Sequence, residues 1–158
     1  TPRSSSAASD VYKRQISSCD LAYSSSRAKY ATPGVNIGLF CSTPMVPLSR
    51  TVGKKQAMEM LLTGDLIDAN KALRIGLIND VFEEDSLKEN VFQIAKKISS
   101  KSSNTIKIGK EAFYKQKDMN LEDAYTFTSK VMTENMLHDD SKEGIDAFLE
   151  KREPNWKE

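Results

Sequence analysis

The segment 63–81 constrains the fold of this chain most, because two glycines and one aspartate divide it into short elements. Gly64 is placed to end one helix, since glycine readily adopts the left-handed conformation that follows many helices. Asp68 is a good helix-capping residue, and Gly76 follows a short helical stretch and precedes an apolar run. The segment therefore predicts one helix, a short second helix and a strand in close succession.

Along the whole chain, the sequence predicts few strands and many helices. Residues that favour strands are concentrated at 16–23 and 28–31, and occur again at 77–82. From residue 43 onward, apolar residues recur at spacings of three and four, which indicates amphipathic helices. The expected helices span residues 43–52, 54–62, 68–75, 86–98, 105–117, 121–137 and 141–152. Consecutive amphipathic helices need a sheet or a neighbouring subunit against which to bury their apolar faces.

Two of these helices carry capping signals at their starts. Ser42 or Thr43 is expected to cap the helix over 43–52. Ser86, with Glu89 three residues later, forms a capping-box pattern at the start of the helix over 86–98. His138 lies between the last two predicted helices and is expected to be a helix-end residue.

Composition excludes several classes of function. The chain has 23 basic and 22 acidic residues, and its net charge of +1 provides no general attraction to nucleic acid or anionic membranes. No apolar run approaches the ~20 residues that cross a bilayer, so we expect no membrane span. Cys19 and Cys41 are isolated, and His138 is far from both, so no metal site is expected. Two buried thiols in a reducing or mitochondrial interior fit this pattern better than a disulfide.

Residues 1–15 differ in character from the rest of the chain. They contain no initiating methionine and no hydrophobic periodicity, and they are biased toward serine and alanine. Such composition is typical of flexible sequence. We interpret residues 1–15 as a foreign or disordered leader and exclude them from the fold argument.

The segments 31–39 and 63–81 together resemble the second half of an enoyl-CoA hydratase/isomerase (crotonase-family) domain, and residues 147–156 match the family ending. The resemblance implies an α/β fold, in which a spiral of ββα units forms two roughly perpendicular sheets and is followed by C-terminal α-helices. On this basis residues 16–100 are the C-terminal part of the crotonase spiral core. Residues 101–158 are the C-terminal helical region, which packs trimers in the family.

The resemblance also implies a function. Family members act on acyl-CoA or enoyl-CoA thioesters, so we expect such a substrate, no resident cofactor, a homotrimer or hexamer, and a mitochondrial location. Crotonase chemistry depends on two backbone N–H groups that stabilise the enolate oxygen of the thioester, and single donors in comparable oxyanion holes contribute ~3–4 kcal/mol. One donor belongs to the N-terminal half of a family domain, and the other falls before Ile16. The resemblance therefore assigns no oxyanion-hole residue to this chain.

The catalytic acids of the family have no counterpart in this sequence. Family hydratases use two glutamates to position and activate water. The second glutamate follows a proline that corresponds to Pro33, but Gly34 occupies its place and cannot transfer a proton. The first falls over Arg14 and Gln15, and the acid of some family isomerases falls near Ser42. The resemblance thus assigns no catalytic residue.

Five residues are candidates for substrate binding by resemblance: Gly34, Asn36, Leu39, Met132 and Lys151. Lys151 corresponds to a lysine that meets a CoA phosphate, commonly across a subunit boundary, and Met132 to an adenine contact. The residues alone leave simpler interpretations open. Gly34 and Asn36 are ordinary turn residues, and a lysine at a helix end interacts favourably with the helix dipole.

Two functions therefore stay open. One is a mitochondrial acyl-CoA-binding relative of the enoyl-CoA hydratases, of the lyase class, whose reaction needs only enolate stabilisation and a different proton donor. The other is a non-catalytic regulatory or assembly member of the family, which uses its C-terminal helices to join homologous trimers.

Overall fold

The computed structural model describes residues 16–156, so the proposed leader and the positions Arg14 and Gln15 lie outside the described residues. The chain forms two compact units, of which the first ends at Phe92 and the second begins at Gln93. The boundary falls within helix α5 (Glu84–Ser99). The division into a spiral core over 16–100 and a trimerisation region over 101–158 remains a prediction.

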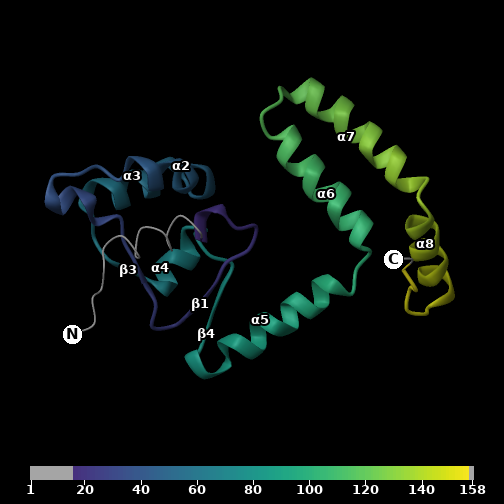
Figure 1. The fold of residues 1–158 in the computed structure, drawn as a ribbon, viewed down its shortest axis with the longest axis horizontal. Coiled ribbons are helices and arrows are strands. Elements are labelled where there is room, and N and C mark those ends of the chain that lie inside the picture. The colour runs from purple at the N-terminus through teal and green to yellow at the C-terminus, as the bar shows by residue number, and fades with distance from the viewer. Residues whose placement is uncertain (1–15, 157–158) are drawn as a thin grey trace. The chain divides into compact units, whose positions relative to one another are not determined.

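The first unit contains two small ladders of strands surrounded by short helices. Its elements in chain order are β1 (Tyr23–Ser25), β2 (Lys29–Tyr30), the 3-10 helix η1 (Pro33–Ile37), α2 (Ser42–Thr51), α3 (Lys54–Thr63), β3 (Ile67–Asp68), α4 (Ala69–Arg74), β4 (Asp80–Phe82) and the first turns of α5. Strands β1 and β4 pair in parallel, with Ser24 opposite Val81 (Figure 1). Strands β2 and β3 pair antiparallel, with Tyr30 opposite Ile67. The parallel pair requires a crossover, which the intervening helices supply.

Within the segment 63–81, the two helix ends and the helix cap form where their residues predict, but the strand expected over 77–82 begins only at Asp80. Gly64 follows α3 with φ 65° and donates its N–H to the carbonyl of Met60 at 3.1 Å. Asp68 caps α4, because its Oδ1 accepts the N–H of Lys71 at 2.7 Å. Gly76, with φ 77°, follows the end of α4 and leads toward β4. The three predicted boundaries are confirmed.

Other predicted element starts are wrong. The expected strand over 16–23 begins as a helical turn at residues 16–18, and β1 starts only at Tyr23. Pairing determines this start, because the backbone of Ala22 exchanges hydrogen bonds with Asn79, which precedes β4. Helix α5 begins at Glu84, and the Ser86 hydroxyl donates to the Glu83 carbonyl, so the predicted capping box is absent.

The start of α2 also differs from the prediction. Cys41 is in the N-cap position and makes no side-chain capping hydrogen bond, so neither Ser42 nor Thr43 is the cap. Cys41 is buried as expected, whereas Cys19 is exposed, so the prediction of two buried thiols holds for only one of them.

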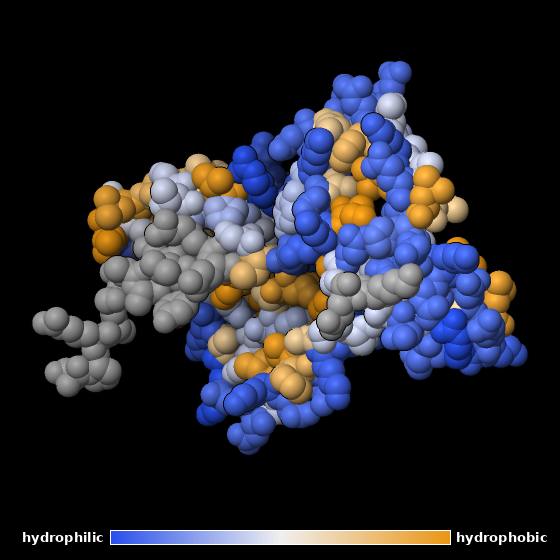
Figure 2. Space-filling model, turned by 45° about the vertical axis from the view of Figure 1, so that its right-hand side comes forward, coloured by the Kyte–Doolittle hydropathy of each residue, from blue (hydrophilic) through white to orange (hydrophobic). Residues whose placement is uncertain are grey.

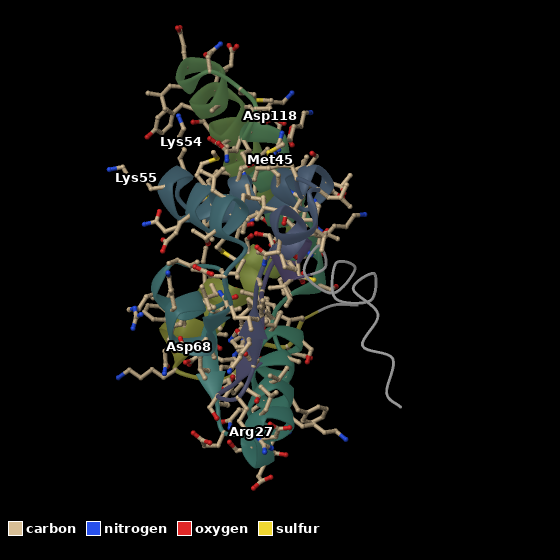
Figure 3. The ribbon with its side chains drawn as sticks, turned by 90° about the vertical axis from the view of Figure 1, so that its left-hand side faces the viewer. Arg27, Met45, Lys54, Lys55, Asp68 and Asp118 are labelled. Carbon is tan, nitrogen blue, oxygen red and sulfur yellow. The ribbon has the colours of Figure 1, made fainter. Side chains whose placement is uncertain are left out.

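The core of the first unit is a contiguous apolar cluster. Its buried members are Tyr30, Cys41, Leu48, Val52, Ala57, Met60, Leu61, Ile67, Ala72, Leu77 and Ile78. Two buried hydroxyl groups are satisfied within it, since Tyr30 donates to the Ser24 hydroxyl at 2.6 Å and Thr32 to the Met60 carbonyl at 2.6 Å. Lys54 and Lys55, by contrast, project away from the start of α3 (Figure 3). The cluster joins β2, α2, α3 and the segment around α4 into one body.

The second unit consists of helices. It contains the end of α5, α6 (Ser103–Gln116), α7 (Leu121–Met136) and α8 (Asp139–Glu150). Helices α6 and α7 lie side by side as an antiparallel pair (Figure 1). Ser102 caps α6 by accepting the N–H of Thr105 at 3.0 Å. The imidazole of His138 caps α8 by accepting the N–H of Asp140 at 3.3 Å, which confirms its helix-end role.

Many apolar side chains of the second unit are exposed, and apolar residues reach the surface in Figure 2. The larger ones are Phe113, Tyr114, Leu121, Tyr125, Met132, Met136, Leu137, Ile145, Phe148 and Leu149. Within residues 16–156, no helix is both long enough and apolar enough to cross a membrane.

Candidate functional site

Three of the five predicted binding residues lie together in the loop that follows β2. The loop turns back on itself, because the N–H of Leu39 donates to the carbonyl of Gly34 at 2.9 Å. A second hydrogen bond joins the N–H of Gly38 to the carbonyl of Val35 at 3.3 Å, and Gly38 has φ 76°. The loop is therefore a closed turn built around η1.

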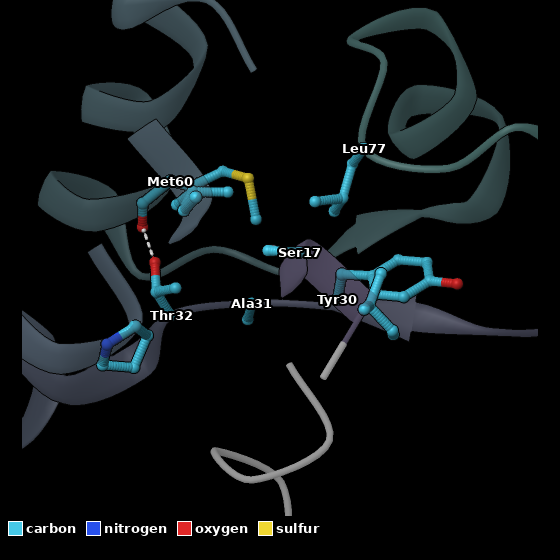
Figure 4. Close-up of a pocket in the computed structure, with 9 residues that line it drawn as sticks. Ser17, Tyr30, Ala31, Thr32, Met60 and Leu77 are labelled. Atoms are coloured by element: carbon cyan, nitrogen blue, oxygen red, sulfur yellow. Dashed lines mark hydrogen bonds between the residues drawn. The ribbon is translucent and has the colours of Figure 1, made fainter. Parts of the chain in front are cut away.

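Helix α3 holds this loop in place. The Thr32 hydroxyl, which is buried, donates to the Met60 carbonyl (Figure 4). At the end of α3, a Cβ atom on Gly64 would lie about 3.1 Å from the amide of Asn36 and 3.0 Å from a methyl group of Val35. Gly64 thus serves both as the helix end and as the surface on which the loop rests. The sequence signalled only the first role.

Gly34 has no free space where a side chain would be, because a backbone carbonyl and a thiol lie there. A Cβ atom at this position would be 2.5 Å from the carbonyl oxygen of Leu39 and 2.8 Å from Sγ of Cys41. Cys41 is 8% exposed, so its thiol is held inside the unit behind the loop. Sequence reasoning identified Gly34 but missed Cys41, because nothing in the local pattern indicates that the loop folds back over it.

The outer face of the loop is open, and the cavity beneath it is small. Leu39 is 63% exposed, and Asn36 is exposed although its amide rests against Gly64. Beneath the loop, Tyr30, Ala31 and Thr32 help to line a cavity of about 20 Å³ (Figure 4). That volume holds about one water molecule and no acyl chain. A large ligand that contacts this loop therefore meets its outer face.

The two remaining candidates belong to the second unit. Met132 is on α7 and is 61% exposed. Lys151 follows α8 with φ 55°, in the left-handed conformation that helix ends usually assign to glycine. The N–H of Arg152 donates to the carbonyl of Ala147 at 3.0 Å and completes the helix end. The structure thus groups Gly34, Asn36 and Leu39 in the first unit, while Met132 and Lys151 belong to the second.

An ion-pair clamp fixes the backbone on both sides of Lys151. Both carboxylate oxygens of Glu143 accept hydrogen bonds from the Arg152 guanidinium, at 2.6 and 3.1 Å, and one also accepts the N–H of Asn155 at 2.7 Å. These donors lower the pKa of Glu143 to about 2. The same contact and a 2.6 Å bond to Glu150 raise the pKa of Arg152. The Lys151 side chain is exposed beside this clamp.

A second ion pair lies in the first unit, away from the loop. Arg27 donates from Nε to Glu84 at 2.7 Å, and Ser25 donates its hydroxyl to the same oxygen (Figure 3). These two hydrogen bonds lower the pKa of Glu84. They join the end of β1 to the start of α5. No group of three or more His, Cys, Asp or Glu within residues 16–156 is arranged to hold a metal ion.

This chain belongs to the enoyl-CoA hydratase/isomerase family, whose model matches residues 16–158. Among curated proteins, it is 50% identical over 141 residues to "Enoyl-CoA hydratase domain-containing protein 3, mitochondrial" of Mus musculus, and 49% identical to the Homo sapiens protein of that name. These matches cover 89% of this chain and 47% and 46% of the relatives, so the chain spans about half their length. Residues 31–44 and 113–116 predict a similarity to this protein, and the comparison confirms it.

Solved structures agree with the crotonase fold. The human enoyl-CoA hydratase domain-containing protein 3 superimposes with a TM-score of 0.87 at 48% identity, over 91% of this chain and 57% of the other. An enoyl-CoA hydratase from Mycobacterium smegmatis superimposes with a TM-score of 0.89 at 40% identity, over 93% of this chain and 57% of the other. The α/β crotonase fold expected from the sequence is confirmed.

Proposed function

We propose that this chain is an acyl-CoA-binding crotonase-family protein of mitochondrial fatty-acid metabolism, like an enoyl-CoA hydratase or isomerase but without the hydratase glutamates. One observation carries the proposal: the chain belongs to the enoyl-CoA hydratase/isomerase family, and Gly34 follows Pro33 where the resemblance puts the second hydratase glutamate. The mitochondrial location is supported by the names of the relatives at about 50% identity.

In this proposal, the loop binds the acyl thioester through its outer face. Leu39 offers an exposed apolar side chain for the acyl or pantetheine part, and Asn36 offers an amide group beside it. Gly34 contributes only backbone groups. Hydration requires one group to remove a proton and another to donate one. Because no such pair is assigned here, we expect the 158-residue chain alone to be inactive in hydration.

Lys151 is the proposed contact for a CoA phosphate. Its left-handed conformation supports this role, because a non-glycine residue in that region is strained and such strain is concentrated at functional sites. The Glu143–Arg152 clamp holds the neighbouring backbone and leaves the ammonium group at the surface. Met132 is proposed to contact the adenine. The CoA thioester is the substrate, and no cofactor is proposed.

The binding proposal is tested by isothermal titration of the full-length protein with butyryl-CoA. We expect Lys151→Asn to weaken binding about 10- to 150-fold, since a hydrogen bond to a charged group contributes ~1.5–3 kcal/mol. Asparagine tolerates the left-handed conformation, so this change removes the charge with little backbone strain. Lys142→Asn, at another exposed lysine of α8, is the matched control. Absence of affinity for any acyl-CoA in the unaltered protein rejects the proposal.

The second candidate is a non-catalytic regulatory or assembly role. It is favoured by the exposed apolar residues of α7 and α8, which suit packing into a homotrimer or hexamer of this chain. Crotonyl-CoA hydration above background by the full-length protein supports the enzyme. Inactivity together with a trimeric mass in light scattering supports the second candidate.

A further inference from the structure

The requirement for glycine at position 34 differs in kind from that at several other glycines. A Cβ atom added at Gly38, Gly76 or Gly109 would have no atom within 4 Å outside its own local backbone. At Gly34, the same atom meets the Leu39 carbonyl oxygen at 2.5 Å and the Cys41 thiol at 2.8 Å. Gly34 has no positive φ, so its backbone conformation does not demand glycine. Glycine is required at position 34 because a side chain there would have no room.

The two groups that fill this space are fixed by their own backbone contacts. Leu39 is held because its N–H donates to the Gly34 carbonyl at 2.9 Å. Cys41 is held because it begins α2, where its carbonyl accepts the N–H of Met45 at 3.0 Å, and because it is part of the buried core. The Leu39 oxygen is a backbone atom, and the Cys41 sulfur ends a short side chain inside the buried core. Relief of the contact therefore requires the loop to move.

We infer that the corner after Pro33 is closed to any side chain, because the Leu39 carbonyl and the Cys41 thiol occupy the volume that a Cβ atom at position 34 needs. The inference rests on the proposed function in one respect, which is that the corner faces the bound acyl thioester. Cys41 and Leu39 therefore determine which reaction is possible at this corner, because they exclude a side chain from position 34. The corner offers backbone groups to the substrate, and it suits thioester chemistry that takes no proton from a side chain at position 34.

Thermal unfolding of the full-length protein tests the steric part. We expect Gly34→Ala to lower Tm by about 2–10 °C, as overpacking of a fixed site does. Gly109→Ala is the matched control, because the added methyl enters open space inside α6 and should leave Tm unchanged or slightly higher. Cys41→Ala in the Gly34→Ala background should recover part of the loss. An unchanged Tm for Gly34→Ala overturns the inference. If the double variant has the same Tm as Gly34→Ala, the Cys41 thiol does not contribute to the steric conflict.

Crotonyl-CoA hydration tests the functional part. We expect Gly34→Glu to hydrate no faster than the unaltered protein, although it supplies the carboxyl group that family hydratases place here. A Gly34→Glu variant with unchanged Tm and at least about 10-fold faster hydration overturns the inference. If Gly34→Glu does not fold, the Gly34→Ala comparison decides the matter. Failure of butyryl-CoA to bind the unaltered protein would reject the proposed function and leave the Tm comparison intact.

Discussion

The two compact units bury their apolar side chains very differently. The first has a contiguous core that includes Leu61, which is 1% exposed. In the second, Ala147 is the one buried hydrophobic residue among those that the structure describes, and it is accompanied by the buried polar pair Ser102 and Asp140. The Ser102 hydroxyl donates to the Asp140 carboxylate at 2.5 Å, which joins the start of α6 to the first turn of α8.

This difference indicates two sources of stability. The first unit is stabilised by removing apolar surface from water, which contributes about 25 cal/mol per Å². The second unit is connected by capping residues, one buried hydrogen bond and the Glu143–Arg152 clamp, and its helices keep large apolar residues exposed. Helices with such faces acquire most of their stability from packing against another surface. We therefore expect the second unit to depend on a partner surface more than the first does.

The largest expected effect is at the core of the first unit. Leu61→Ala should lower the free energy of unfolding by about 2–5 kcal/mol, because it leaves a cavity in a packed cluster. Leu121→Ala on α7, where the side chain is 74% exposed, should change the free energy of unfolding of the monomeric chain by less than about 0.5 kcal/mol. Urea unfolding of both variants measures the difference. Equal losses would show that the two regions do not differ in this way.

The next effect is at the polar pair of the second unit. Ser102→Ala should cost about 1–3 kcal/mol, because it removes a donor from the buried carboxylate of Asp140, whose other oxygen has no hydrogen-bond partner. Faster amide hydrogen exchange in α6 and α8 should report the loss. The control is Ser99→Ala, since the Ser99 hydroxyl only contacts a carbonyl of its own helix. Unchanged exchange in α8 would show that this pair does not connect the two helices.

A smaller effect is expected at the cap of α4. Asp68→Ala should cost about 1 kcal/mol, because the N–H of Lys71 loses its acceptor, and Asp68→Asn should retain most of the stability. Asp65→Ala, an exposed substitution in the same turn, is the control. Both values are measured by urea unfolding. If Asp65→Ala and Asp68→Ala have the same free energy of unfolding, the Asp68 cap does not stabilise the first unit.

The smallest effect is at the Glu143 clamp, because its groups are partly exposed and solvent screens them. Its pKa of about 2 is below the ordinary value of 4.5, so the folded state binds a proton less readily than the unfolded state. The stability from this group is present above about pH 4.5 and is lost as the pH falls toward 2. The Tm difference between the unaltered protein and Glu143→Gln should therefore shrink between pH 6 and pH 3.

Glu111→Gln, at an exposed position on α6, is the control for this pH series. A difference that grows as the pH falls would contradict the assignment of the low pKa to Glu143.

Local signals made the boundaries of the segment 63–81 predictable. A capping aspartate and a glycine at a helix end act on groups within one turn, so Asp68, Gly64 and Gly76 could be identified without knowledge of the fold. The start of β1 could not, because it depends on pairing with β4, far along the chain. The exposure of Cys19 also depends on tertiary packing, and its side-chain type does not determine it.

The candidate site was predictable to a similar degree. The resemblance identified Gly34 as the position without an acid, and the structure has this residue in η1, within the closed turn. The thiol of Cys41 behind Gly34 was not predictable, since it depends on how the loop closes. Likewise, lysine is not a residue type that signals a left-handed helix end, so the sequence did not indicate the conformation of Lys151.

Trp156 is the sole tryptophan of the chain, and its position makes it an internal reporter. Its indole N–H donates to the Ser100 carbonyl at 2.8 Å, and its ring lies within 3.4 Å of the place where a Cβ on Gly144 would be. Its emission therefore reports docking of the C-terminal tail alone. Release of the tail into water should shift that emission to longer wavelength, even while the first unit stays folded.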